Sequence, residues 1–92
     1  MAPRGEVLIR HVEPNYTADA MRARIQGILF LDAVVLPNGT VGDVRILVSL
    51  DRESGLDQAG IAAVRQWRFK PGTVRGTTGA MIVQIEMAFR LK

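Results

Sequence analysis

The last segment of the chain alternates between two kinds of side chain, and this pattern constrains the fold more than any other feature. One phase is entirely apolar: Met81, Val83, Ile85, Met87, Phe89 and Leu91. The other phase is mixed: Ala80, Ile82, Gln84, Glu86, Ala88 and Arg90. A period of two over this length predicts a β-strand with one face buried and one face largely in water. The rest of the chain must therefore supply a layer that covers one face of a sheet.

Two further strands are predicted in the first half of the chain. Residues 28–36 are nearly all apolar and are followed by Pro37-Asn38-Gly39. Residues 41–50 would then form the second strand of a hairpin. Asn-Gly between apolar segments is the strongest short signal for a hairpin. Val41 is out of phase with the later apolar residues of its strand. We therefore expect a bulge near residues 42–43, which would restore the phase.

The segment between residues 17 and 27 has the pattern of a short helix. Thr17 can cap its first turn through the side-chain oxygen. We expect Met21 and Ile25 to share one face and Gly27 to end the helix. A helix of about two turns has only marginal stability on its own, so this helix must depend on tertiary packing.

A second helix is predicted from the region of Ser54. Ser54 and Asp57 have the form of a capping box, and apolar or small residues follow at helical spacing as far as Trp67. Gly60 costs about 1 kcal/mol in helix propensity relative to alanine, which suggests close packing against the sheet. Residues 68–70 are expected to be extended already, and residues 73–78 to form a loop.

These elements predict a two-layer α+β domain, with two helices on one face of an antiparallel sheet. The sheet has three strands, or four if residues 7–12 join it. We assign residues 1–12 to an N-terminal arm or extra strand and residues 13–92 to the domain. The even phase of the first hairpin strand is unusually apolar. It would suit a dimer contact or a face closed by the arm.

The composition of the chain excludes several classes of function. The 92 residues include no cysteine and one histidine, His11, so neither a thiolate metal site nor a site with two imidazoles can form. No polar group has persuasive catalytic spacing, and we expect no enzyme activity, metal or cofactor. The longest nearly apolar run, residues 28–36, contains Asp32 and is far shorter than the roughly 20 residues of a membrane span.

The net charge of +3 first suggests nucleic acid as a partner. The basic residues Arg65, Arg68, Lys70 and Arg75 gather around the end of the second helix, where cations are favoured by the helix dipole. Sheets that bind nucleic acid expose aromatic side chains for stacking. Here Trp67, Phe69 and Phe89 occupy core-like positions, so we expect no nucleic-acid partner.

One long motif carries a resemblance. The segment reads Leu56-Asp57-Gln58-Ala59-Gly60-Ile61-Ala62-Ala63-Val64-Arg65-Gln66-Trp67-Arg68-Phe69-Lys70-Pro71. It is preceded by Pro14-Asn15-Tyr16 and by the hairpin, and it is followed by the alternating strand that ends near Phe89. In this order and spacing, the chain resembles the TonB C-terminal domain family from about residue 13 to residue 91. Thr17 departs from the proline usual in that family, but a threonine cap does a related job.

The resemblance implies a terminal domain of a periplasmic energy transducer that is anchored in the inner membrane in its full-length form. Such a domain would bind the peptide box of an outer-membrane TonB-dependent transporter by strand addition, in siderophore and similar transport. It would transmit force from the motor proteins of the inner membrane, which it reaches through an anchor missing from this sequence. A homodimer stays open. The alternatives are a TonB-like periplasmic scaffold or peptidoglycan-contacting module and, less favoured, a small basic nucleic-acid-binding protein.

The resemblance also implies where the peptide would bind. The last strand would be the docking edge, and the segment before the first helix would be a second contact region. The candidate peptide-binding residues are Glu13, Asn15, Tyr16, Met81, Ile82, Val83, Gln84, Ile85, Glu86 and Met87. Tyr16, Trp67 and Phe69 are expected to serve mainly as packing residues.

Overall fold

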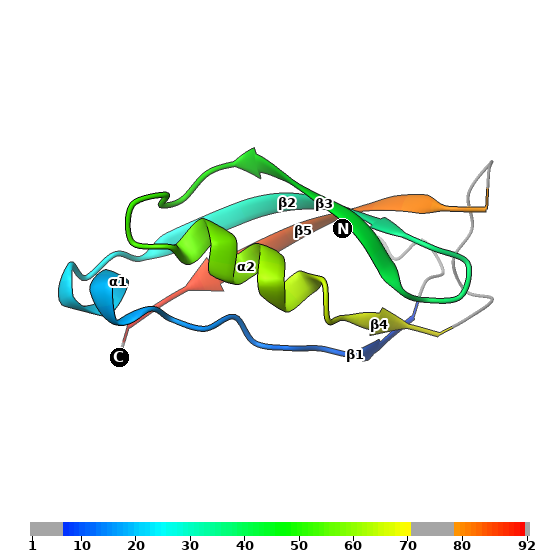
Figure 1. The fold of residues 1–92 in the computed structure, drawn as a ribbon, viewed down its shortest axis with the longest axis horizontal. Coiled ribbons are helices and arrows are strands. Elements are labelled where there is room, and N and C mark those ends of the chain that lie inside the picture. Colours follow the sequence, from blue (N-terminus) through cyan, green and yellow to red (C-terminus); the bar gives the residue numbers. More distant parts are fainter. Residues whose placement is uncertain (1–6, 71–78, 92) are drawn as a thin grey trace.

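Three long strands form the sheet on which the rest of the molecule packs (Figure 1). The computed structural model describes residues 7–70 and 79–91. The strands are β2 (Gly27–Val35), β3 (Val41–Val48) and β5 (Met81–Phe89), in the antiparallel order β3-β2-β5. The core lies on one face of this sheet. It includes alternate residues of β2 and β5: Leu29, Leu31, Ala33, Val35, Val83, Ile85, Met87 and Phe89.

The hairpin between β2 and β3 follows the sequence prediction. The amide of Gly39 donates to the carbonyl of Leu36 at 2.8 Å, and Gly39 has a positive φ of 88°. Asn38 stabilises the turn, because its side-chain oxygen accepts a hydrogen bond from the Thr40 amide at 3.0 Å. The expected bulge is also confirmed. Ala33 faces Val44 while Val35 faces Val41, so β3 carries one extra residue across positions 42–43.

The helix α2 (Leu56–Val64) packs on β2 and β3 (Figure 1). Its buried residues include Leu56, Ala63 and Val64. Gly60 faces the sheet at very short range. A Cβ atom added there would lie 2.4 Å from Cδ2 of Leu29 and 3.3 Å from Sδ of Met87. The close packing expected at Gly60 is therefore confirmed. Only a residue without a side chain lets the helix axis approach the sheet this closely.

The capping box predicted at the start of α2 is wrong. Gly55 is the N-cap residue and provides no side-chain hydrogen bond. The carboxylate of Asp57 turns away from the helix instead. It accepts from the hydroxyl of Ser49, from the amide of Leu50 at 3.0 Å and from the amide of Asp51 at 2.9 Å. Asp57 thereby joins the start of α2 to the loop after β3, and this loop offers more donors than a single cap.

The helix α1 (Ala18–Arg22) is shorter than expected, and its buried face was predicted wrongly. Thr17 does cap it, accepting from the Ala20 amide at 3.2 Å. However, Ala20 is the buried residue, whereas Met21 is 48% exposed. The helix ends well before Gly27, because Arg24 takes a positive φ of 54° and turns the chain toward β2. Five residues are too few to define a continuous face, so the expected pairing of positions 21 and 25 does not form.

A second, two-stranded sheet lies beside α2. The strand β1 (Leu8–Arg10) pairs with β4 (Arg68–Phe69), which confirms the extended geometry expected at residues 68–69. The leading strand thus pairs outside the three-stranded sheet. It therefore does not cover the even-numbered apolar residues of β2, and Ile28 is 36% exposed to solvent. The predicted loop at residues 73–78 lies outside the described residues.

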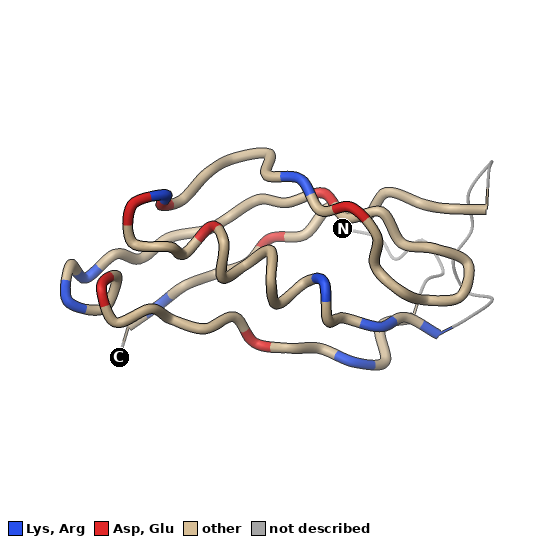
Figure 2. Tube along the Cα trace, viewed as in Figure 1, with Lys and Arg blue, Asp and Glu red and all other residues tan. Residues whose placement is uncertain are grey.

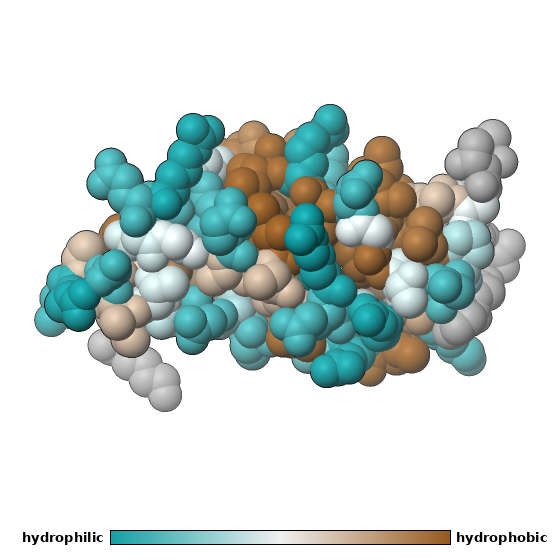
Figure 3. Space-filling view, viewed as in Figure 1, coloured by the Kyte–Doolittle hydropathy of each residue, from teal (hydrophilic) through white to brown (hydrophobic). Residues whose placement is uncertain are grey.

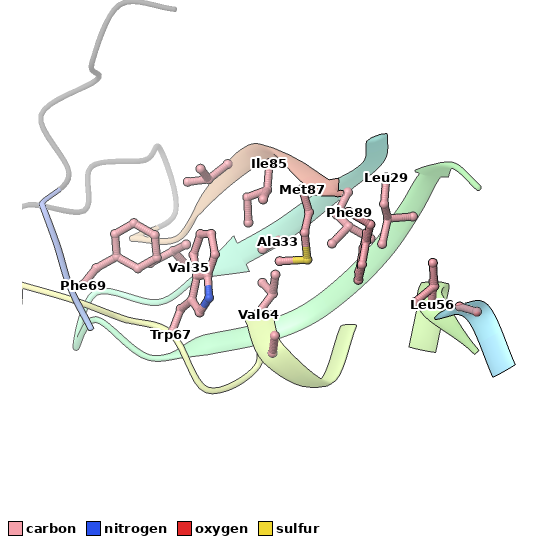
Figure 4. Close-up of a cluster of buried hydrophobic side chains, with 14 residues drawn as sticks. Leu29, Ala33, Val35, Leu56, Val64, Trp67, Phe69, Ile85, Met87 and Phe89 are labelled. Carbon is pink, nitrogen blue, oxygen red and sulfur yellow. The ribbon is translucent and has the colours of Figure 1, made fainter. Parts of the chain in front are cut away.

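Trp67 joins the two sheets to the core. Its side chain is 8% exposed, and its indole N–H donates to the carbonyl of Val12 at 3.0 Å. Figure 4 shows the ring among the side chains that line the sheet, near Val35 and Phe69. The packing roles expected for Trp67 and Phe69 are confirmed, since both are buried in the core cluster. Tyr16 is half-buried and packs against the same cluster.

Filling the space at Gly60 should destabilise the domain. Gly60→Val forces carbon atoms onto Leu29, and overpacking of this kind costs about 1–3 kcal/mol. Ala62→Val is the matched control, because it places valine on the exposed side of the same helix. Chemical denaturation monitored by circular dichroism measures both. Equal free energies of unfolding for the two variants would contradict the close approach.

Asp57→Asn should lower stability at neutral pH and flatten its acid dependence. Burial alone would raise the pKa of Asp57. The hydrogen bonds from the Asp51 amide, the Ser49 hydroxyl and the Leu50 amide, with Arg52 nearby, outweigh burial and lower the pKa.

Because the folded pKa is depressed, the charged carboxylate stabilises the fold above its unfolded pKa, about 3.9. That contribution is lost as the pH falls through the folded pKa. We expect a cost of about 1–3 kcal/mol at pH 7 that shrinks toward pH 2. Exposed Asp43→Asn is the control. A constant difference between wild type and Asp57→Asn across this range would contradict the assignment.

Truncation of the indole should nearly unfold the domain. Trp67→Ala removes a large buried ring and leaves the Val12 carbonyl without its donor, and we expect a loss of about 3–5 kcal/mol. Met21→Ala, at an exposed position, should change stability by less than about 0.5 kcal/mol. Thermal melts of both variants test this. An unchanged melting temperature for Trp67→Ala would refute its place in the core.

Candidate peptide-binding site

The two edges of the three-stranded sheet differ in regularity. β5 pairs with the central strand β2 at nine consecutive positions, from Met81–Val35 to Phe89–Gly27, without a register shift. β3, at the opposite edge, shifts register against β2 twice. Bulges twist an edge and disrupt its row of backbone donors and acceptors, whereas a regular edge is a template for another strand. β5 is therefore the edge better suited to accept an added strand.

The described residues place nothing in register against the outer side of β5. Strand pairing there involves only β2, and β1 and β4 pair with each other. An extended chain could lie along roughly 30 Å of this edge, at about 3.4 Å for each of its nine residues. Backbone hydrogen bonds would then hold it largely independently of its side chains.

The side chains of the candidate residues on β5 divide between two faces. Val83, Ile85 and Met87 point into the core and are 5–8% exposed, and Met81 is half-buried. Figure 4 shows Ile85 and Met87 on the core side of the sheet. Ile82, Gln84 and Glu86 are exposed on the opposite face. The solvent-facing side chains of a peptide at this edge could therefore contact Ile82, Gln84 and Glu86, but not the buried residues.

Tyr16 connects the segment before α1 to the far end of β5. Its ring meets that of Phe89, the last residue of β5, edge to face with centroids 5.6 Å apart. Its hydroxyl donates to the carbonyl of Ile25. The structure thus brings Tyr16 to the end of β5, where it anchors the segment before α1.

Glu13 and Asn15 lie elsewhere. Both are exposed, and together with exposed residues of α2 they line an open groove of about 400 Å³. The other side of the groove includes Gln58 and Ala62 of α2 and Gln66, in the turn just after the helix. These three were not predicted from the sequence, although their spacing of four residues in a segment with a helical pattern would have grouped them.

One of the basic residues near the end of α2, Arg68, has structural partners, and Arg75 lies outside the described residues. Arg68 donates to the carbonyls of Arg65 at 3.2 Å and Trp67 at 2.7 Å, close to the helix C-terminus. Arg10 lies opposite Arg68 in the β1–β4 pair, so basic residues gather at this end (Figure 2). On the face that carries α2, polar and apolar side chains are interspersed (Figure 3). The two hydrogen bonds of Arg68 favour the structural interpretation of that arginine.

Within residues 7–70 and 79–91, no group of three or more histidine, cysteine or acidic side chains is arranged to hold a metal ion. None of the helices in these ranges is long and apolar enough to cross a membrane.

Comparison with known proteins gives a consistent result. Residues 12–91 match the family model of the Gram-negative bacterial TonB protein C-terminal. A protein TonB from Xanthomonas campestris is 37% identical over 78 residues, which cover 85% of this chain and 34% of the relative. Protein tonB2 from Pseudomonas aeruginosa is 40% identical over 58 residues, 63% of this chain and 21% of the relative. The chain spans about a third of the length of the Xanthomonas campestris relative.

The fold has a counterpart among solved structures. The solution NMR structure of the Pseudomonas aeruginosa TonB C-terminal domain aligns with a TM-score of 0.74 at 20% identity. The alignment covers 98% of this chain and 90% of that one. The two-layer α+β architecture predicted from the sequence is thereby confirmed.

Proposed function

The chain belongs to the family of Gram-negative bacterial TonB C-terminal domains, and on that premise we propose that it binds an extended peptide of an outer-membrane transporter by strand addition along β5. The peptide would be the box segment of a TonB-dependent transporter. The observation that carries the proposal is the unbroken register of β5 at one edge of the sheet, opposite an edge interrupted twice. The site of action is the periplasm, in a transducer anchored in the inner membrane.

The arrangement supports transmission of force as well as binding. A strand added to β5 would be hydrogen-bonded to a strand that is itself paired with the centre of the sheet over its whole length. Tension on the peptide would therefore pass into β2 and the core rather than into a loop. At the other end, Trp67 and Tyr16 fasten residues 12–16 to the same core. Motor proteins of the inner membrane would act through chain that precedes this segment in the full-length transducer.

The proposal is tested by adding transporter box peptides to the isotopically labelled domain. We expect amide chemical-shift changes along β5 and in residues 13–16, with little change along β3. A matched peptide with N-methylated alternate amides, methylated in either of the two phases, is the control. One of the two phases should abolish the shifts because it removes the backbone donors that face β5.

Two results would contradict this proposal. Shifts confined to β3 would place the peptide on the wrong edge. An absence of shifts at millimolar peptide would show that the domain does not bind such segments at all.

A further inference from the structure

A run of exposed apolar side chains lies on and beside the short strand β1. Val7, Leu8 and Ile9 are 46%, 40% and 60% exposed, and Ile9 is the most exposed large apolar side chain in residues 7–70 and 79–91. Single exposed apolar residues are ordinary on a soluble domain, whereas contiguous ones indicate a surface that contacts something apolar. β1 therefore presents an apolar contact surface to its surroundings.

The pairing of β1 with β4 explains why Ile9 is exposed. Leu8 faces Phe69, and Arg10 faces Arg68. Because Arg68 and Phe69 are adjacent in the chain, β4 has no residue left to lie opposite Ile9, and the register shifts at this point. An extra residue of this kind is left out of the ladder, and its side chain takes a direction that a regular strand pair would not give it.

The same pair of strands concentrates positive charge. Arg10 and Arg68 face each other directly, and like charges in this arrangement destabilise a strand pair. Arg65 is the C-cap residue of α2, close by along the chain. None of the ion pairs within the described part of the chain includes these three arginines. The carbonyls that accept from Arg68 are neutral, so its charge remains (Figure 2).

From this combination we propose that β1, β4 and the C-terminal end of α2 dock on an anionic phospholipid bilayer. Such a bilayer presents acidic headgroups above its acyl chains, and a protein surface with both cations and aliphatic side chains complements it. Leu8 and Ile9 would enter the boundary between headgroups and acyl chains. Arg10 and Arg65 would lie among the phosphates, to which a guanidinium can donate two parallel hydrogen bonds.

The apolar component distinguishes a bilayer from a polyanion in water. A nucleic acid would attract the arginines but would leave Ile9 exposed. Protein surfaces that bind single-stranded nucleic acid offer exposed aromatic rings for stacking, whereas Trp67 and Phe69 beside this surface are 8% and 5% exposed. An anionic bilayer accommodates both the charge and the aliphatic side chains. This proposal does not depend on peptide binding at β5, because it concerns other strands.

Cosedimentation of the 92-residue chain with lipid vesicles tests the proposal. One set of vesicles mixes phosphatidylglycerol with phosphatidylcholine, and the other contains phosphatidylcholine alone. At low salt we expect at least about tenfold tighter binding to the anionic vesicles, because each arginine near an anionic surface contributes about 1 kcal/mol. High salt should reduce this difference by screening the charges. Equal binding to both kinds of vesicle would overturn the proposal.

Two matched pairs of variants locate the surface. Arg10→Gln should weaken binding to the anionic vesicles about fivefold. Arg24→Gln is its control, because Arg24 is an exposed residue just after α1, at the opposite end of the molecule from β1 and β4 (Figure 1). Ile9→Thr should weaken binding about three- to tenfold through lost apolar burial. Val48→Thr is its control, at a residue of β3 that is 54% exposed.

Melting curves separate binding from folding. Arg10→Gln removes a contact between like charges, so its melting temperature should equal or exceed that of the wild type even though vesicle binding falls. A lower melting temperature with unchanged vesicle binding would show a purely structural role and overturn the proposal. So would an equal loss of binding in Arg10→Gln and Arg24→Gln.

Two further measurements identify the partner. Binding of a short oligonucleotide without any binding to anionic vesicles would overturn the proposal in favour of a polyanion in water. Box peptides should shift the β5 amides of Arg10→Gln and Ile9→Thr as they shift those of the wild type. Loss of vesicle binding alone therefore bears on this proposal, and loss of the peptide shifts alone bears on the proposed function.

Discussion

The indole of Trp67 is the interaction on which the rest of the structure most depends. It follows α2 directly, packs in the core between the two sheets, and donates its N–H to the carbonyl of Val12. The ring of His11 lies against it with centroids 4.8 Å apart. A domain of 92 residues buries a limited core, and here no disulfide can compensate because the chain has no cysteine. A large aromatic ring that also satisfies a backbone carbonyl therefore holds together elements that would separate without it.

The positions of α2 and of the edge strand β5 are linked through the same core. Gly60 lets α2 approach Leu29 of the central strand and Met87 of β5. This contact commits the odd phase of β5 to the interior and leaves its even phase to solvent. β5 pairs with β2 without a register shift, whereas β3 shifts its register against β2 twice. The helix that packs on the sheet thus contacts the inner face of the same strand whose outer edge is regular.

Regular patterns predicted most of this fold from the sequence. The alternation in β5, the Asn-Gly turn and the phase slip near position 42 each depend on local geometry, and each gave the correct element. The predictions that failed or stayed open concerned which of several possible partners a residue or strand would bond to. Asp57 had a cap available three residues away, yet it bonds to Ser49, Leu50 and Asp51, which only the folded loop brings within reach. The partner of residues 8–10 was likewise undetermined, because their pairing with β4 spans about sixty residues and leaves no periodic trace.

The candidate site shows the same division between local and tertiary information. The sequence could indicate the last strand, but only the sheet order places it at an edge, with no strand paired to its outer side in residues 7–70 and 79–91. Tyr16 and Glu13 belong to one short segment, yet one packs on Phe89 and the other lines a groove against α2. Their alternation in an extended segment sends them to opposite sides. Since the odd residues of β5 are buried, a partner can be distinguished only through the even ones. The backbone would then supply the grip common to many partners, and a few exposed side chains would decide how each one is aligned.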